Sequence, residues 1–504
     1  MRLSVPWGAA VAEQVRAVDV TLRDGQMSLW AQRMRTGMII PIAQELDRAG
    51  FDAVEIIAPS FFKKCVRELK EDPFERLRIV SAEMYTPLRA IMNRHVAAFQ
   101  MTSPAVSRLW LERLAANGVR EVRVSDPSNT VENLKEQVRL AREVGLDVIV
   151  NLVFSVSPKH TDDYYTRRMR ALEHVDATRF CLKDPSGLLQ PERCRALSRA
   201  MLAVAGGKPV EIHNHCNTGL GSLCAIEAVE AGIRIVNTAI PPLSNGASLP
   251  SVFNLKHNLG ALGYNLDVAE GPLRDVSEYL FQLAKRHGFP VGVPAEYDAY
   301  HYKHQVPGGM ISNFKFQLQA LGMSDRLPEV LEEIVAVRAD LGYPIMVTPY
   351  SQFVGTQALM NVISGERYKE VTDEIISYVS GAWGAEEADN VDLDVKDKIM
   401  ARHRAREIAS RPPLEESLAE LRQRLTGQAG GDDDELLLRL LSGSADVDAM
   451  RSVPKTDTAF SATHPLVDLV SGLARSQFSH IVVEGADLRL SLSRSRNKGE
   501  RDTP

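Results

Sequence analysis

The chain has 504 residues, of which 44% are hydrophobic and 25% are charged, and its formal net charge is -6. These values are ordinary for a globular protein, and the length predicts two or three domains, although an α/β barrel alone can take about 250 residues. The negative charge balance and the lack of a long Lys/Arg block before residue 430 argue against nucleic acid as a partner. No apolar run reaches the roughly 18 residues that a membrane span needs, so we expect none.

The amino terminus and the cysteines indicate a cytoplasmic protein. The first apolar stretch is interrupted by Pro6 and Gly8, so it does not have the pattern of a signal peptide. The five cysteines are odd in number and form no CxxC pair. This usage is typical of reduced thiols rather than of a disulfide framework.

Eight short β-rich runs alternate with helical stretches in the first half of the chain. In order they are RAVDVTL, FDAVEIIA, LRAIMN, VREVRVSD, LDVIVNLVFS, ATRFCLKD, KPVEIHNH and IRIVNTAI. Several are apolar without alternation, as in parallel strands that are covered on both faces. Eight such units predict a closed (β/α)8 TIM barrel over residues 17–265, after an N-terminal segment at 1–16. The active site of such a barrel lies at the carboxyl ends of its strands.

Smaller parts are expected after the barrel. Mostly helical patterns predict a helical domain over residues 266–425 that packs near the barrel mouth. The Gly- and Asp-rich stretch TGQAGGDDDE then begins a flexible linker at 426–460. A small α+β module of one helix and two strands is predicted at 461–494, and a disordered tail at 495–504.

Two histidines end the seventh predicted strand. His213 and His215 lie two residues apart, so both side chains share one strand face and point into the barrel mouth. One interpretation is that they supply half of the ligands of a site for Zn, Mn or Co. The other is that they are a pair of hydrogen-bonded core residues. Asp24 closes the first strand, a near neighbour in the ring, and is either a third ligand or a helix N-cap.

Arg23 and Lys183 are further charged residues at strand ends. The planar guanidinium of Arg23 can hold a carboxylate or a developing enolate, can pair with Glu55, or can do both. A buried lysine is costly unless it is paired or neutralised. Lys183 is therefore either an amine that CO₂ converts to an anionic, metal-binding carbamate, or an ammonium that pairs with Asp184.

Seven motifs, in order between residues 17 and 425, resemble the biotin-dependent carboxyltransferase family. They are TLRDGQMSLWAQRMRT, EDPFERLR, SPKHTDDYY, LKDPSGLL, EIHNHCNTG, VPGGMISN and VTPYSQFVGTQA. The family includes the carboxyltransferase domain of pyruvate carboxylase, the oxaloacetate decarboxylase alpha subunit and the keto-acid subunit of transcarboxylase. The resemblance implies a barrel followed by a helical funnel domain. It also implies transfer of CO₂ between carboxybiotin and a small 2-oxo acid or related enolisable substrate through a metal-stabilised enolate.

The resemblance implies roles for particular residues. The family's divalent-metal ligands fall on four residues, namely Asp24, Lys183, His213 and His215. The lysine is carbamylated in the family. The family arginine that binds the keto acid falls on Arg94. The family threonine that relays a proton between substrate and biotin falls on Ser312, where serine keeps the hydroxyl.

Two departures from the family pattern border the expected substrate pocket. Many members read RDAHQS where this chain reads RDGQMS, so Met27 replaces a glutamine that helps to hold pyruvate, and Gln26 lies one position earlier. After the second strand, IIAPSFF at residues 56–62 replaces the usual WGGA. We therefore take Gln26 and Met27 as candidate substrate-binding residues and leave the acceptor open to larger or more apolar compounds.

The expected partners follow from a missing motif. No AMKM stretch occurs, so the biotin must be supplied in trans on a biotin carboxyl carrier protein, together with a biotin carboxylase subunit. The module at 461–494 is similar to the N-terminal segment of the carrier protein of acetyl-CoA carboxylase. It is either a docking module or an unrelated accessory element. The family also implies a homodimer.

Two other functions remain open on the sequence. One is a biotin-independent Claisen-type synthase or lyase of the same barrel superfamily, since TLRDG and a set of two histidines and an aspartate also occur there. The other is a non-catalytic assembly subunit of a carboxylase complex. Lys183 and the later PGG and SQFVGTQA motifs favour the carboxyltransferase over the first alternative.

Overall fold

The centre of the protein is a closed barrel of eight parallel strands. The computed structural model describes residues 13–93, 102–320, 322–410, 417–427, 431–453, 480–485 and 488–493. Strands β2 to β8 follow one another in the sheet, and β1 pairs with both β8 and β2, which closes the ring. The strands are β1 (Glu13–Asp19), β2 (Ala53–Ile57), β3 (Leu88–Asn93), β4 (Val119–Ser125), β5 (Asp147–Val153), β6 (Arg179–Asp184), β7 (Val210–Asn214) and β8 (Ile235–Thr238). The predicted TIM barrel is confirmed.

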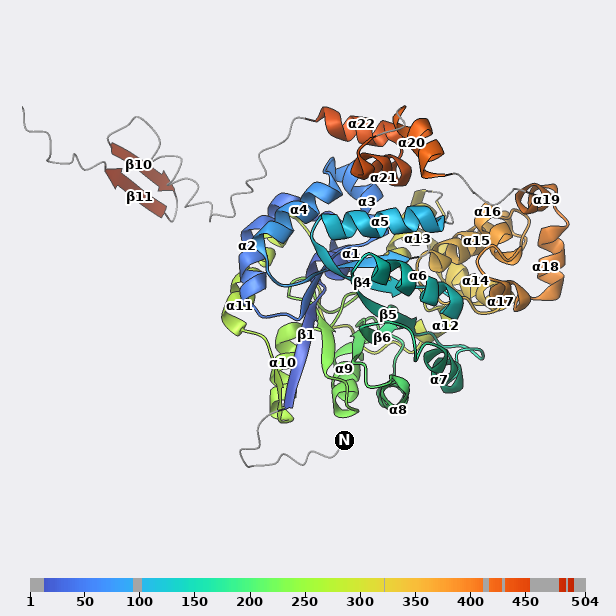
Figure 1. Cartoon of the computed structure of the whole chain (residues 1–504), viewed down its shortest axis with the longest axis horizontal. Helices are drawn as coiled ribbons and strands as arrows, with labels where there is room; N and C mark the ends of the chain where they lie inside the picture. The colour runs from blue at the N-terminus through green and yellow to red at the C-terminus, as the bar shows by residue number, and fades with distance from the viewer. Residues whose placement is uncertain are drawn as a thin grey trace, which may run out of the picture. The chain divides into compact units, whose positions relative to one another are not determined.

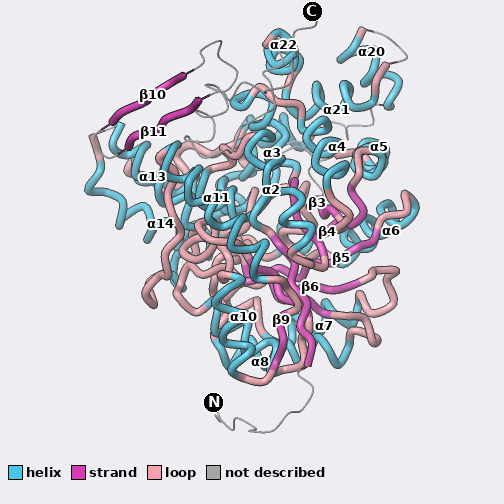
Figure 2. The backbone as a smooth tube through the Cα atoms, turned by 90° about the vertical axis from the view of Figure 1, so that its left-hand side faces the viewer, coloured by secondary structure: helices cyan, strands magenta, loops and turns pink. Residues whose placement is uncertain are grey.

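Helices surround these strands (Figure 1), and Figure 2 shows the strands running inside the helical layer. Local sequence signals start several of them. The Asp72 side chain accepts hydrogen bonds from the first amides of one helix, and Ser103 caps the next, each just before a proline. The barrel helices are α2 (Thr36–Arg48), α4 (Pro73–Glu83), α5 (Pro104–Ala116), α6 (Val131–Glu143), α7 (Asp162–Ala171), α8 (Pro191–Val204), α9 (Gly221–Glu230) and α10 (Val252–Ala261). A short strand, β9 (Tyr264–Leu266), pairs with the first residues of β1.

A helical region follows the barrel, as predicted. Its first helix, α11, packs against α2 on the outside of the barrel. The later helices share an apolar core of their own that includes Ile334, Tyr350, Tyr378 and Trp383. The helices are α11 (Glu270–His287), α12 (His301–His304), α13 (Gly308–Ala320), α14 (Leu327–Asp340), α15 (Tyr350–Ser364), α16 (Asp373–Val379), α17 (Ala385–Asp389), α18 (Leu393–Met400) and α19 (His403–Ala409).

The segment that was expected to be a flexible linker contains two packed helices. α20 (Leu418–Thr426) is followed by α21 (Asp433–Ser442) and α22 (Ser444–Ser452), and α21 packs against α3 (Pro59–Lys64) and α5. Three consecutive leucines of α21 are buried, and Asp432 caps its first turn. The Gly- and Asp-rich stretch thus contains a helix start, and the leucine run behind it buries enough apolar surface to hold the segment on the barrel.

The last described residues form a separate unit. β10 (His480–Gly485) and β11 (Leu488–Ser493) pair antiparallel, with Gly485 opposite Leu488. The two strands predicted for this module are therefore confirmed, whereas its predicted helix and the tail at 495–504 lie outside the described residues. Among the helices that the structure describes, none has the length and apolar character to cross a membrane.

Candidate metal centre at the barrel mouth

A tight turn after β1 places two charged side chains at the carboxyl end of the barrel. In the π-helical turn η1 (Thr21–Gly25), the carbonyl oxygen of Val20 accepts hydrogen bonds from the amides of Arg23, Asp24 and Gly25. A Cβ at position 25 would lie 2.9 Å from the carbonyl oxygen of Leu243, so the turn needs glycine there. Asp24 is thereby held inside the mouth instead of capping α1 (Gln26–Trp30), whose N-cap is Gly25.

Asp24, His213 and His215 come together as one buried cluster. The Asp24 Oδ2 atom lies 3.1 Å from His213 Nε2 and 3.4 Å from His215 Nε2. One ligand atom from each residue falls within 4.8 Å of the other two, and all three side chains are buried. The other carboxylate oxygen, Oδ1, accepts a hydrogen bond from Ser28 Oγ at 3.2 Å. The three residues therefore present one oxygen and two nitrogens to a single point, as a divalent metal requires.

The hydrogen bonds behind the two imidazoles test whether this cluster fits a metal. His215 Nδ1 lies 2.7 Å from the carbonyl oxygen of Ala247. A carbonyl only accepts, so Nδ1 carries the proton and Nε2 presents its lone pair. His213 Nε2 is buried and makes no hydrogen bond within the described part of the chain. Both observations fit a metal ion between the imidazoles and Asp24.

Burial and neighbouring charges leave the Asp24 carboxyl ionised and the His213 imidazole neutral. Burial opposes the ionisation of Asp24, but the positive charge of Arg23 and contacts with both imidazoles outweigh it and hold the pKa of the carboxyl well below its usual range. Burial lowers the pKa of His213 to about 3, so its imidazole is neutral at physiological pH. An anionic oxygen donor and a neutral nitrogen donor are the forms that bind metals.

Lys183 lies beside the cluster on β6, paired in register with His213. Burial, reinforced by the charge of Arg23, lowers the pKa of its amine to about 8. The alternative pair with Asp184 is not formed among the described residues; the Asp184 carboxylate instead accepts from the amides of Leu188 at 2.9 Å and Leu189 at 2.7 Å. The neutral amine is the form of lysine that reacts with CO₂, and this pKa leaves Lys183 neutral for much of the time near pH 8.

Arg23 is held by two carboxylates at once. Its Nε donates to Glu55 Oε1 at 2.5 Å, and its NH2 atom lies 2.7 Å from Asp24 Oδ2. The predicted pair with Glu55 is therefore present. All three side chains are buried, so the guanidinium holds the carboxylate of Asp24 in place.

The structure describes the side chains of two of the other candidate residues, Gln26 and Met27, but not those of Ser312 and Arg94. Gln26 is buried, and its amide donates to the carbonyl of Leu22 and accepts from the amide of Met34, so both ends are engaged with backbone. Met27 is half-buried at the start of α1. Ser312 lies in α13, but its side chain is not among those described, and Arg94 lies outside the described residues.

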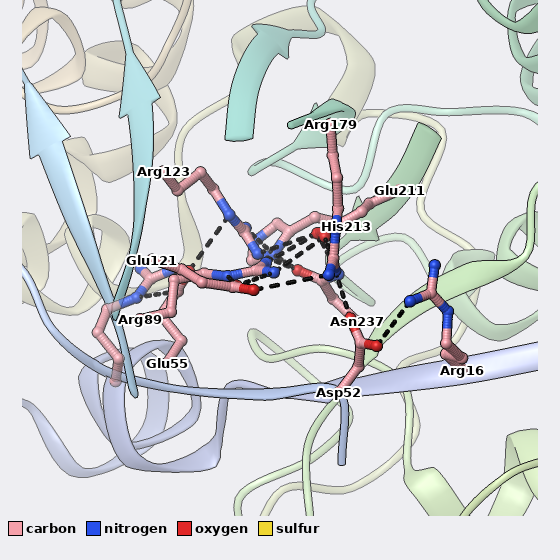
Figure 3. A network of polar contacts seen from close by, with 11 residues as sticks. Arg16, Asp52, Glu55, Arg89, Glu121, Arg123, Arg179, Glu211, His213 and Asn237 are labelled. Carbon is pink, nitrogen blue, oxygen red and sulfur yellow. Dashed lines mark hydrogen bonds and ion pairs between the residues drawn. The ribbon is translucent and has the colours of Figure 1, made fainter. Parts of the chain in front are cut away.

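The sequence did not reveal a network of buried charges that reaches His213 (Figure 3). Arg89 makes a two-pronged contact with Glu211, at 2.8 and 2.9 Å, and donates to Glu121 at 2.9 Å. Arg123, from β4, reaches His213 and Asn237. The available signal was the presence of charged residues at alternate positions inside otherwise apolar strands, as in VREVRVS.

Comparison with known proteins places the chain in a family. A family profile described as HMGL-like matches residues 14–279, and one described as a conserved carboxylase domain matches residues 302–461. The first covers the barrel and the second covers most of the helical region that follows it. Because the two matches together run through most of the chain, they constrain both parts of the architecture.

Individual relatives agree with these profiles. A pyruvate carboxylase subunit of Methanocaldococcus jannaschii is 35% identical over 73% of this chain and 66% of its own length, so this chain spans just under two thirds of that relative. The methylmalonyl-CoA carboxyltransferase 5S subunit of Propionibacterium freudenreichii subsp. shermanii is 30% identical, with 86% of this chain and 87% of the relative covered.

A solved structure shows the same fold. The carboxyl transferase domain Y628A of Rhizobium etli pyruvate carboxylase, solved with pyruvate, superposes with a TM-score of 0.78 at 24% identity. The match covers 95% of this chain and 84% of that one. The barrel, the helical region behind it and the relatives of both lead to one conclusion: this chain belongs to the family of biotin-dependent carboxyltransferases.

Proposed function

We propose that this chain transfers a carboxyl group between carboxybiotin, carried on a separate protein, and a small 2-oxo acid or related enolisable substrate. The observation that carries the proposal is the buried cluster of Asp24, His213 and His215 at the barrel mouth. The names of the relatives support the reaction class, since one belongs to a pyruvate carboxylase and the other to a carboxyltransferase.

Four side chains would hold a divalent ion of Zn, Mn or Co. They are Asp24, His213, His215 and Lys183, the last as a carbamate. Such an ion, when bound, supplies a Lewis acid that favours the enolate of the substrate. The carbamate forms when the neutral amine of Lys183 adds to the carbon of CO₂ and releases one proton, which leaves an anionic oxygen donor. The lowered pKa of Lys183 supports this step because it increases the fraction of neutral amine.

The protein's other residues bind substrate and move a proton. Arg94 is assigned to the substrate carboxylate, which a guanidinium binds through two parallel hydrogen bonds. The Ser312 hydroxyl, on α13, is assigned to proton transfer between the substrate carbon and the ureido nitrogen of biotin. Met27, half-buried beside η1, is assigned to the wall of the acceptor pocket. We leave Gln26 out of the binding set because its amide is already bonded to backbone.

The partners and the location follow from the same proposal. Biotin would arrive on a biotin carboxyl carrier protein that a biotin carboxylase subunit charges, and two copies of this chain would form a homodimer. The hairpin β10–β11 belongs to the module that we assign to docking of this machinery. All five cysteines are free and buried, which supports a reducing compartment such as the cytoplasm.

A reconstituted transfer assay tests the proposal. The purified chain is mixed with a carboxybiotinylated carrier protein and, in turn, with pyruvate, 2-oxobutyrate and 2-oxoglutarate, and carboxylated product is measured. Carrier-dependent product is the expected result. Turnover of an acyl-CoA without any biotin would instead favour the Claisen-type alternative. A chain that folds and loads metal but transfers nothing to any acceptor would favour an assembly subunit.

A further inference from the structure

The two imidazoles of the cluster differ in what lies behind them. His215 Nδ1 faces only an acceptor, the carbonyl oxygen of Ala247, at 2.7 Å. His213 Nδ1 faces two groups of opposite character. Asn237 Oδ1 lies 3.0 Å away, and the Arg123 NH1 atom lies 2.8 Å away (Figure 3). His215 is thus fixed in the tautomer that carries its proton on Nδ1. His213 has an acceptor that suits this tautomer, Asn237, and a donor that suits the other tautomer, Arg123.

Only one of these partners makes His213 a ligand. A guanidinium can only donate, so a hydrogen bond from Arg123 uses the lone pair of Nδ1 and leaves the ring proton on Nε2, where it blocks coordination. The side-chain oxygen of Asn237 can only accept. A hydrogen bond from Nδ1–H to this oxygen leaves the Nε2 lone pair directed at Asp24, 3.1 Å away.

The amide of Asn237 is held with its oxygen toward His213. Its Nδ2 atom donates to Glu211 Oε2 at 3.2 Å, and Glu211 is itself fixed by the two-pronged contact with Arg89. Arg123 NH2 also donates to Asn237 Oδ1. A rotated amide would lose these bonds and place its nitrogen against two other donors, so the acceptor stays in place.

Arg123 has another partner available when it releases His213. Its Nε atom lies 3.3 Å from Glu55 Oε2, and both atoms are buried without a hydrogen bond in the part of the chain that the structure describes. A small rotation of the guanidinium toward Glu55 would satisfy both of them. Arg123 can therefore leave Nδ1 free to carry a proton without losing its charge partners.

We propose that Asn237 is a positioning residue for the metal site, and that it makes His213 a ligand by accepting the Nδ1–H bond while Arg123 turns to Glu55. The inference rests on the metal site of the proposed function and adds the residue that sets its affinity. For His215 the acceptor of the Nδ1–H bond is the backbone carbonyl of Ala247, which a side-chain substitution does not remove.

Metal affinity is the measurement that tests this role. The apo form of the full chain is titrated with Co²⁺ in competition with a chelator. Asn237→Leu removes the acceptor and keeps a similar volume. Its dissociation constant should rise about 10- to 100-fold, as is typical when a hydrogen-bond partner of a ligating histidine is lost. Asn237→Ala replaces it if the leucine variant does not fold. Asn237→Asp, which keeps an acceptor, should bind Co²⁺ more tightly than either.

Glu121→Gln is the matched control, since Glu121 contacts Arg89 in the same network but makes no contact with His213. It should leave the dissociation constant unchanged even if it lowers stability. Equal affinity in wild type and Asn237→Leu, or equal weakening by Glu121→Gln, would overturn the inference while the metal site stands. Failure of the wild-type chain to take up Co²⁺ would instead overturn the metal site itself.

Discussion

His215 Nδ1 lies 2.7 Å from the carbonyl oxygen of Ala247, and this one contact fixes the imidazole with its Nε2 lone pair toward Asp24. His215→Ala removes that lone pair from the cluster. We expect its metal affinity to fall by more than about 100-fold, beyond the loss seen when only a supporting partner is removed. Elemental analysis after dialysis against dilute chelator measures the bound metal.

The matched control for this variant is His257→Ala, which removes an exposed histidine of α10 that is not part of the buried cluster. It should retain the metal content of the wild type. Full metal occupancy in His215→Ala would show that the imidazole is not a ligand. It would also remove the main observation behind the proposed function.

The carbamate assigned to Lys183 predicts a signal that depends on one side chain. In ¹³C-bicarbonate, the wild type should give a ¹³C carbamate resonance that is absent from Lys183→Arg, because a guanidinium stays protonated and cannot add to CO₂. The variant should also bind metal at least about 10-fold more weakly, since it lacks an anionic donor. Lys208→Arg is the control, because Lys208 lies away from the cluster and donates to backbone carbonyls. An unchanged resonance in Lys183→Arg contradicts the assignment.

The proton-relay role of Ser312 predicts a loss of rate without a loss of metal. Ser312→Ala should lower carboxyl transfer by about 10²- to 10⁴-fold, which is the usual contribution of a positioned acid or base. Ser312→Thr keeps a hydroxyl and should recover most of the activity. Metal content and thermal stability should match the wild type in both variants. If the alanine variant transfers carboxyl groups at the wild-type rate, the relay must use another group.

The barrel and the His-x-His pair could be predicted because both depend on local patterns. Eight apolar runs separated by helical stretches lead to parallel strands, and a two-residue spacing places His213 and His215 on one face. The same reasoning placed Asp24 near them, because the turn after the first strand enters the same mouth. The sequence does not predict the tautomers of His213 and His215, because these depend on hydrogen bonds to Asn237 and Ala247, which come from later parts of the chain.

The charge network was beyond local patterns for a similar reason. Arg89 and Glu211 are 122 positions apart, and only the closure of the barrel brings them within hydrogen-bonding distance. The packing of α21 was missed because the Gly- and Asp-rich stretch before it is typical of linkers, while its contacts with the barrel are made by residues more than 300 positions earlier. Sequence periodicity shows which face of an element is buried but not what buries it.

Asp434 joins α21 to the barrel and should contribute measurably to stability. Its carboxylate accepts from Arg113 Nε at 2.7 Å, Arg78 NH1 at 2.9 Å and Asn117 Nδ2 at 3.2 Å. Asp434→Ala leaves these donors without their acceptor. It should lower the free energy of unfolding by about 1 to 3 kcal/mol, because both arginines remain partly solvated. Urea unfolding gives the loss.

Limited proteolysis separates a local effect from a global one. In Asp434→Ala, cleavage within residues 431–453 should precede cleavage of the barrel. Asp446→Ala, in the neighbouring helix α22, should behave like the wild type. A variant of Asp434 with unchanged stability and unchanged cleavage would mean that the buried leucines alone hold this segment.

Asp19 predicts a pH dependence of stability that a single substitution removes. It is buried at the end of β1, and burial raises the pKa of its carboxyl from 3.8 to about 7 despite hydrogen bonds from Thr21. The folded state therefore binds this proton more tightly than the unfolded state does. The contribution of this proton to the free energy of unfolding is complete below about pH 4 and is lost as the pH rises through about 7.

Asp19→Asn has no such proton, so the variant should gain stability relative to the wild type over this window. The gain should reach up to about 4 kcal/mol above pH 7 and be near zero below pH 4. Chemical denaturation of both proteins at several pH values measures the difference, which isolates Asp19 from the other buried carboxyls common to both chains. A difference that stays constant from pH 4 to pH 8 would show that the carboxyl is ionised throughout and that the contacts of Thr21 outweigh its burial.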